Sequence, residues 1–555
     1  MNINSETFTV PVNTVEEELI TYRMTPMYMS DDGLYFFNKS DLFRLDYDGI
    51  FHRLKLANFD EVVLDNNEPI AYMITYNSSS ISAKVYDIIQ EKFLYSKTIF
   101  VNARFIDKAL VTTSSTGASI WYTNDGSFYQ YCSLTTKSIS NNCDINVSFD
   151  VSKGDLVLDS YPYLCFFEDL GVSGSNIKIV NITNNRKWTF RSNTVFTALH
   201  GKIFVPLDAN QEENEDPTVV CVIYNDECIT LHVPGIIVES AGNDNFAIFS
   251  VFTGDDTEVY VLTIDDLGNF ILKMFPILPG YKTFSPNGNL IYVRGFENFG
   301  TIFETDKIIK EKNFDKNSIK RKSKNDFLIF NELNTNAPTI IHFHGGPESF
   351  EVPEPRMFGM PQYAISAGWN WIGVNYHGSL SPTKDFTKYA WRNWRESLTR
   401  DIDKALDLTN GDIIFAGWSF GAAIALAFAS HSPRIKGLLL GGTPGDLKQH
   451  MRFASNIDIS HRLWFNERFD FNGDDGLLFN GVSGFTSNVK IIEFHGKLDK
   501  NCPLKLSDNI AMKWEMLGNP WKRFIFPNCE HYPSDQSDVL VFVKEARSFL
   551  HHVLD

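Results

Sequence analysis

The sequence has none of the cysteine patterns that hold zinc sites or disulfide-rich domains together. Its seven cysteines include no CxxC pair and no Cys/His cluster with metal-ligand spacing. Because the number is odd and the positions are scattered, we expect reduced thiols, as in a cytoplasmic protein, rather than a disulfide framework. No motif requires a metal or an organic cofactor, so we expect none.

An excess of positive charge and a membrane-spanning segment are missing as well. Fifty Lys and Arg residues stand against 68 Asp and Glu residues, and the formal net charge of −18 repels nucleic acid and anionic lipid. The N-terminus lacks the basic and apolar segments of a secretory signal. The longest apolar stretch, Ile413 to Ala429, is too short to span a bilayer. We therefore expect no nucleic-acid or membrane partner, and the composition leaves homo-oligomerisation open.

The sequence does contain enough apolar surface for two folded domains. With 555 residues, 43% of them hydrophobic, the chain exceeds the roughly 250–300 residues that one core supports. Residues 1–313 carry short β-branched and aromatic runs between Asn, Asp, Gly and Ser turns, which is typical of an all-β domain. Seven segments recur at intervals close to the ~40–50 residues of a blade and predict a β-propeller of about seven blades. An array of two-sheet sandwiches is the alternative, because the segments share no repeat signature.

The pattern changes after a polar linker at 314–323, which overlaps the densest basic run of the chain. From 324 to 555, apolar strands alternate with helical segments, as in a mostly parallel sheet covered on both faces. Six successive strands are predicted, with the sequences PTIIHFHGG, WNWIGVNYHG, DIIFAGWSF, IKGLLLGG, VKIIEFHG and KRFIFPN. We therefore expect this half to be a doubly wound α/β domain.

The strongest chemical signal is the pentapeptide GWSFG at 417–421, which matches GxSxG. It follows the predicted strand DIIFA and precedes the predicted helix AAIALAFAS, as in the nucleophile elbow of α/β-hydrolases. A sharp strand-to-helix turn leaves no room for side chains at its glycines and projects the serine hydroxyl above the sheet. Ser419 is therefore the predicted nucleophile of an α/β-hydrolase domain.

A serine hydroxyl needs a base to accept its proton, and in this fold an acid and a histidine follow the serine, in that order, after later strands. Asp499 follows the strand VKIIEF in HGKLD, and His531 follows KRFIF in PNCEH. These two residues complete the predicted catalytic triad. Other candidates for the acid or the base fit less well, because they follow no comparable strand or adjoin the pair in its own turns: Asp474, Asp475, Glu530 and His495.

The negatively charged oxygen formed when a serine attacks a carbonyl group needs N–H donors. One donor is expected from Phe420, which follows the nucleophile at the start of a helix. The other is expected from the loop HGGP at 344–347, which follows an early strand, and we assign it to the N–H group of Gly345. An ordinary tight turn is the alternative for this loop.

These motifs resemble those of the prolyl oligopeptidase family of serine peptidases, which includes acylaminoacyl peptidases and dipeptidyl peptidases. HGGP, NYHGS at 375–379, GWSFG, HGKLD and EH occur in the family's order and at similar spacings. The resemblance covers the α/β half by motif, whereas the first half is similar only in being a plausible propeller. The sequence departs from the family at Ala422, where glycine is common, and at NCPL after the acid, where VP is common.

The resemblance implies a serine peptidase whose propeller restricts access to the active site. Short peptides or flexible peptide tails would be hydrolysed through an acyl-enzyme on Ser419, and an acylaminoacyl-peptidase-like or oligopeptidase-like enzyme is the preferred subclass. An esterase, a thioesterase or a peptide acyl-transfer enzyme of the cyclase type is the alternative, because the same triad serves amides and esters. A non-catalytic propeller scaffold is the alternative of another class, and the complete triad argues against it.

Overall fold

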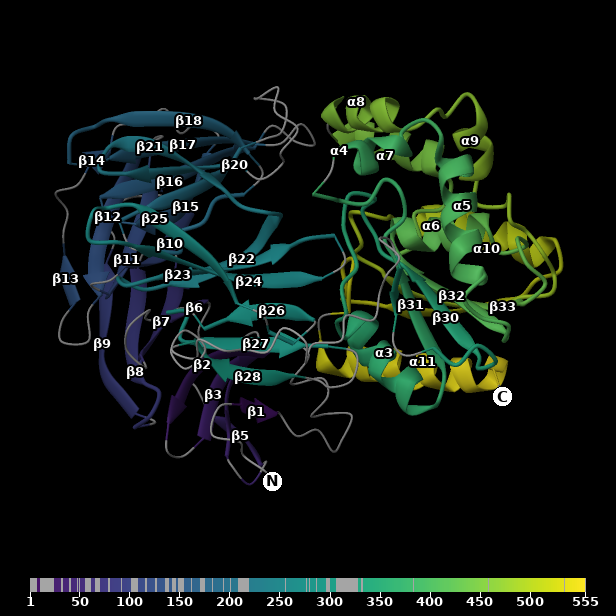
Figure 1. Ribbon diagram of the computed structural model, residues 1–555, viewed down its shortest axis with the longest axis horizontal. Helices are drawn as coiled ribbons and strands as arrows, with labels where there is room; N and C mark the ends of the chain where they lie inside the picture. Colours follow the sequence, from purple (N-terminus) through teal and green to yellow (C-terminus); the bar gives the residue numbers. More distant parts are fainter. Residues whose placement is uncertain are drawn as a thin grey trace.

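The computed structural model places a β-rich body, built from the N-terminal half, beside an α/β body built from the C-terminal half (Figure 1). The described residues are 7–9, 24–305 with gaps, 328–330, and 333–554 without 383, 458 and 534; the longest gaps within 24–305 are 55–60, 101–107, 148–153 and 208–218. The predicted linker, 314–323, lies outside the described residues. The domain boundaries drawn from the sequence therefore stay a prediction.

The N-terminal half forms seven antiparallel sheets among its described residues, which agrees with the predicted seven-bladed propeller. Most strands pair with their neighbours along the chain, because short polar turns join them into hairpins. The strands of the first four sheets are β2 (Met24–Ser30), β3 (Gly33–Asn38), β4 (Asp41–Leu45), β5 (Phe51–Leu54); β6 (Glu61–Leu64), β7 (Ile70–Asn77), β8 (Ser80–Asp87), β9 (Lys92–Phe100); β10 (Lys108–Ser114), β11 (Gly117–Asn124), β12 (Ser127–Leu134), β13 (Ile139–Asn141), β14 (Asn146–Val147); and β15 (Gly154–Ser160), β16 (Tyr163–Asp169), β17 (Ser175–Asn181), β18 (Lys187–Ser192). Those of the next three are β19 (Ile203–Pro206), β20 (Val219–Tyr224), β21 (Glu227–His232); β22 (Ile236–Gly242), β23 (Ala247–Phe252), β24 (Thr257–Ile264), β25 (Phe270–Phe275); and β26 (Tyr281–Phe284), β27 (Leu290–Arg294), β28 (Thr301–Glu304) with β1 (Thr7–Thr9).

The N-terminal strand completes the last sheet. β1 pairs antiparallel with β28, in the order β1-β28-β27-β26, so the two ends of the all-β half meet in one sheet. Most sheets also begin one strand earlier than the corresponding predicted blade. The first predicted blade starts at Gly33, the first residue of β3, whereas the first sheet begins with β2. Successive hairpins look alike in a sequence without a repeat signature, and the pattern therefore gave the number of sheets but not their first strands.

Apolar side chains fill the spaces between neighbouring sheets. Phe204 of β19 meets Phe249 of β23 with ring centroids 5.3 Å apart, and both rings are fully buried. Burial of one such side chain contributes about 1.5–3 kcal/mol. Core packing between sheets therefore accounts for these aromatic residues without a ligand.

One pair of cysteines departs from the expectation of reduced thiols. Cys221 of β20 and Cys228 of β21 form a disulfide, with their Cα atoms 5.9 Å apart. The hairpin turn at Asn225 and Asp226, both with positive φ, folds the two strands against each other and brings the two cysteines together. The expectation of reduced thiols is therefore wrong for this pair, while Cys165, Cys502 and Cys529 are buried and not part of a disulfide.

The C-terminal half is built on a seven-stranded sheet in the order β29-β31-β30-β32-β33-β34-β35. The six predicted strands are β30 (Thr339–Phe343), β31 (Asn370–Val374), β32 (Ile413–Trp418), β33 (Ile435–Gly441), β34 (Lys490–Gly496) and β35 (Trp521–Phe526). They run parallel to one another. The seventh strand, β29 (Leu328–Phe330), pairs antiparallel with β31 at the edge and is too short to show a pattern in the sequence.

Helices cover both faces of this sheet, which confirms the doubly wound α/β prediction. Residues of α3 and α11 pack on one face, and residues of α5, α6 and α10 pack on the other. The helices are α3 (Arg356–Ser366), α4 (Lys384–Tyr389), α5 (Trp394–Leu406), α6 (Phe420–Ala427), α7 (Leu447–Ile457), α8 (Ile459–Arg468), α9 (Asp474–Leu478), α10 (Leu504–Met516) and α11 (Gln536–Leu554). None of the helices in the described part of the chain has the length and apolar character needed to cross a membrane.

The two bodies touch beside the carboxyl ends of the parallel strands. The ring of Phe252 on β23 stacks on Phe350, in the segment between β30 and α3, at a centroid distance of 4.1 Å. The side-chain amide of Asn375, directly after β31, donates a hydrogen bond to the carbonyl oxygen of Gly254 at 3.3 Å. In an open α/β sheet this edge is where ligands bind, so propeller loops lie next to the predicted site.

Candidate active site

The predicted nucleophile lies in a tight turn between β32 and α6. Ser419 has φ 57° and ψ −122°, a backbone conformation that residues other than glycine rarely adopt. A Cβ atom added at Gly421 would lie 1.9 Å from the carbonyl oxygen of Phe343, and one added at Gly417 would lie 2.4 Å from the carbonyl carbon of Gly421. Only glycine fits at either position, which is the physical reason for the GxSxG spacing.

The predicted acid and base lie in contact at the same edge of the sheet. Nδ1 of His531 is 2.7 Å from Oδ2 of Asp499, whose side chain is completely buried. The loop after β34 carries Asp499 and the loop after β35 carries His531. The indole N–H of Trp418 donates to the carbonyl oxygen of His531 at 2.9 Å, which ties this loop to the strand that carries Ser419.

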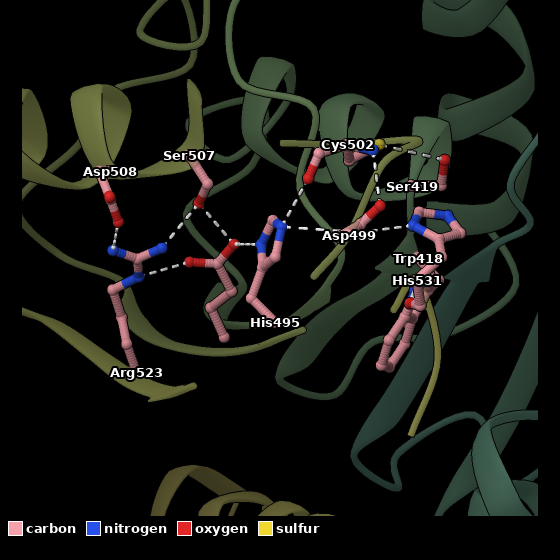
Figure 2. Close-up of polar contacts among 10 residues, drawn as sticks. Trp418, Ser419, His495, Asp499, Cys502, Ser507, Asp508, Arg523 and His531 are labelled. Carbon is pink, nitrogen blue, oxygen red and sulfur yellow. Dashed lines mark hydrogen bonds and ion pairs between the residues drawn. The ribbon is translucent and has the colours of Figure 1, made fainter. Parts of the chain in front are cut away.

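Ser419, Asp499 and His531 line one cavity of about 1220 Å³. Figure 2 shows the contact between His531 and Asp499 and the contact between Ser419 and Cys502 within the same site. The hydroxyl oxygen of Ser419 is hydrogen-bonded to Sγ of Cys502 at 3.7 Å. The structure therefore brings the three predicted residues together, with the serine hydroxyl turned toward a thiol.

Cys502 is the residue of this site that sequence reasoning missed. Besides its contact with Ser419, it donates its backbone N–H to Oδ1 of Asp499 at 2.7 Å. Burial, and then the charge of Asp499, raise the pKa of its thiol. The thiol is thus a neutral neighbour of the nucleophile. The signal for it was the sequence NCPL after the acid, where it departs from the family motif.

The two residues predicted to supply the oxyanion donors are close to Ser419. Phe420 is the first residue of α6, and the first N–H groups of a helix have no intrahelical partner. Gly345 follows β30, and a Cβ atom added there would lie 3.3 Å from Cβ of Ser419. The role of their N–H groups stays a prediction.

A buried, neutral histidine supports the loop that carries Gly345. His344 packs its ring on that of Tyr376 with centroids 4.4 Å apart. Its Nδ1 faces the carbonyl oxygen of Gly345 at 2.7 Å, and its Nε2 faces the hydroxyl of Ser379 at 2.7 Å. Burial lowers the pKa of His344 to about 4, so the ring is neutral, with Nδ1–H donating and Nε2 accepting.

The alternative acids and bases have other partners. Asp475 is buried and accepts the backbone N–H groups of Trp394 and Asp470, a structural role. Asp474 and Glu530 are exposed on the surface. His495 is fully buried behind Asp499. Among the described residues, no group of three or more His, Cys, Asp or Glu side chains is arranged to hold a metal ion.

Comparison with known proteins gives structural matches only. No family model matches the chain, and no curated protein sequence matches it. The acylaminoacyl peptidase of Pyrococcus horikoshii aligns with a TM-score of 0.62 at 12% identity over 97% of both chains. An acylaminoacyl peptidase in complex with Z-Gly-Gly-Phe-chloromethyl ketone aligns with a TM-score of 0.64, also at 12% identity over 97% of both chains.

A puromycin-hydrolyzing peptidase from Mycobacterium tuberculosis aligns with a TM-score of 0.61 at 12% identity, over 98% of this chain and 97% of that one. These alignments span both bodies of the molecule, and at such low identity they establish the fold. The chain therefore has the two-domain fold of these peptidases, a propeller followed by an α/β-hydrolase domain, as its sequence motifs predict.

Proposed function

We propose that the protein is a serine peptidase of the prolyl oligopeptidase type, with Ser419 as the nucleophile, His531 as the base and Asp499 as the acid. The observation that carries the proposal is the 2.7 Å contact between His531 and Asp499 on the cavity that also contains Ser419. The fold shared with acylaminoacyl and puromycin-hydrolyzing peptidases supports it. Each residue comes from a separate loop at the carboxyl edge of one sheet, as the triad geometry requires.

The geometry assigns each group a step. Asp499 accepts a hydrogen bond from Nδ1–H of His531, which leaves Nε2 free to take the proton of the Ser419 hydroxyl. For this step the hydroxyl turns from Cys502 to His531. The serine oxygen then bonds to the substrate carbonyl carbon, and the N–H groups of Phe420 and Gly345 stabilise the negative oxygen. The carbon–nitrogen bond breaks, and the amine leaves with the proton from His531. Water then attacks the acyl-enzyme, while His531 takes a proton from the water and returns it to the oxygen of Ser419.

The lining of the cavity favours a peptide with an apolar side chain. α7 and α8 contribute Phe453, Ala454, Trp464 and Phe465 to its lining. Aromatic walls of this kind bury a hydrophobic side chain. The propeller contacts the domain that carries the triad through Phe252 and Phe350, which supports a propeller that restricts entry to short peptides or flexible tails.

A substrate panel on purified protein tests this function. We expect hydrolysis of N-acylated and free aminoacyl anilides with aromatic or aliphatic side chains, and faster turnover of short peptides than of folded proteins. Ser419→Ala measured in parallel removes the contribution of any contaminating peptidase. Turnover of short-chain esters together with complete inactivity on anilides would contradict the peptidase assignment and favour an esterase on the same triad.

A further inference from the structure

A buried polar network lies behind the acid of the proposed triad (Figure 2). His495, at the end of β34, places Nδ1 at 2.9 Å from Oε1 of Glu493 and Nε2 at 2.7 Å from the carbonyl oxygen of Cys502. The same Nε2 is 3.6 Å from Oδ2 of Asp499. The side chains of His495, Glu493 and Asp499 are all completely buried. The network therefore connects the core of the sheet to the turn that carries the acid.

The partners of His495 fix its protonation state. A backbone carbonyl oxygen can only accept a hydrogen bond, and an ionised carboxylate can only accept one as well. Burial opposes ionisation of Glu493, but His495 and Arg523 lower its pKa to about 2, so it is ionised. Both ring nitrogens of His495 must therefore donate, and the ring is an imidazolium.

The charged groups around the imidazolium compensate for its burial. Glu493 also accepts hydrogen bonds from the hydroxyl of Ser507 at 2.6 Å and from the guanidinium of Arg523 at 2.7 Å. Arg523, on β35, is paired in turn with Asp508 on α10 at 2.6 Å. Burial disfavours the charged ring of His495, but the hydrogen bond and the charge of Glu493 outweigh it and raise the pKa of His495.

We propose that His495 is a positively charged positioning residue, which holds the Asp499–Cys502 turn, and with it the acid of the proposed triad, in place. This proposal rests on the proposed function, since it concerns the acid of that triad. Oδ2 of Asp499 faces both rings, at 2.7 Å from His531 and 3.6 Å from His495. The imidazolium of His495 therefore supplies the buried carboxylate with a counter-charge and fixes the orientation in which Asp499 meets His531.

The rate of labelling by a fluorophosphonate probe at pH 7 tests this proposal without a known substrate. In His495→Gln the positive charge beside Asp499 is absent. We expect the labelling rate to fall about tenfold, because Asp499 loses this counter-charge and the turn that carries it is held less precisely. His431→Gln, which alters a surface histidine paired with Asp403, is the matched control and should leave the rate unchanged.

The charge of His495 is measured independently by NMR. Labelled histidine ring nitrogens report protonation directly, and the signal of His495 is assigned as the one lost in His495→Gln. We expect both of its nitrogens to be protonated at pH 7. A neutral ring at pH 7, or a His495→Gln variant that is labelled at the wild-type rate, would overturn the charged positioning role. Wild-type protein that does not react with the probe at any pH would instead overturn the proposed function, and the positioning role with it.

Discussion

Two buried histidines near the active site have pKa values shifted in opposite directions. On the side of β30, His344 faces a carbonyl oxygen and a hydroxyl, and burial lowers its pKa to about 4. On the side of β34, His495 is equally buried but faces the carboxylate of Glu493, and its pKa is raised. Burial alone favours the neutral ring, so the neighbouring carboxylate decides the difference.

This difference in charge fits the proposed mechanism, in which the loop of Gly345 and the turn of Asp499 take part in different steps. Beside Gly345, where negative charge develops on the substrate oxygen, the closest histidine is neutral and leaves stabilisation to backbone N–H groups. Behind Asp499, the charged ring of His495 lies next to the carboxylate that holds the base. Four substitutions, given in order of decreasing effect, test this difference.

Ser419→Ala removes the hydroxyl group that is the proposed nucleophile. We expect peptide turnover to fall by about 10⁴-fold or more, because the remaining site has no nucleophile. Thermal unfolding, followed by circular dichroism, should stay close to wild type, since the hydroxyl contributes chemistry and little packing. Appreciable turnover by this variant would mean that another residue is the nucleophile.

Asp499→Asn removes the carboxylate that lies between His531 and the charged His495. We expect kcat to fall by about 10³-fold, because the amide no longer favours the tautomer of His531 that has a free Nε2. It also leaves the imidazolium of His495 without its second counter-charge. Asp265→Asn, in an exposed turn of the propeller, is the control and should be neutral. Equal rates for Asp499→Asn and wild type would exclude Asp499 as the acid.

Gly345→Val changes the loop beside the neutral His344, which carries the second proposed oxyanion donor. A Cβ at this position already lies 3.2 Å from the carbonyl oxygen of Trp418 and 3.3 Å from Cβ of Ser419, so the branched side chain would displace the N–H donor. We expect about a 10²-fold loss in kcat, comparable to the loss of one oxyanion donor. Gly268→Asn, in an open propeller turn, is the control for a glycine replacement. A change in KM alone would show that Gly345 only contributes to binding.

The neutral histidine should also affect acid stability. The pKa of His344 is about 4 when folded and ordinary, near 6.5, when unfolded, so the unfolded chain binds the proton first. The contribution of His344 to stability is complete above pH 6.5 and is lost as the pH falls toward 4, by about 2 kcal/mol at pH 4.5. Urea unfolding of wild type and His344→Gln at pH 7 and 4.5 measures this, and the variant should show the smaller pH-dependent loss. Equal losses would contradict a neutral His344.

Much of the site could be predicted from sequence because its signals are local. GxSxG, HGGP and HGKLD each combine a strand end with residues that the turn itself requires, as Gly417 and Gly421 show. The α/β half follows from its alternating pattern for the same reason. The charge of His495 could not be predicted, because Arg523, which pairs with its neighbour Glu493, meets Glu493 only when β34 and β35 pair. The contact of Cys502 with Ser419 likewise joins loops distant in sequence, and the strand β1 joins its sheet from the other end of the propeller.

Mass spectrometry of protein labelled with a fluorophosphonate probe tests the assignment of the nucleophile. We expect a single modified residue, Ser419, in the wild-type protein, with labelling strongly reduced in His531→Ala and Asp499→Asn. A wild-type protein that remains unmodified at Ser419, or one labelled at the same rate when His531 is replaced, would contradict it.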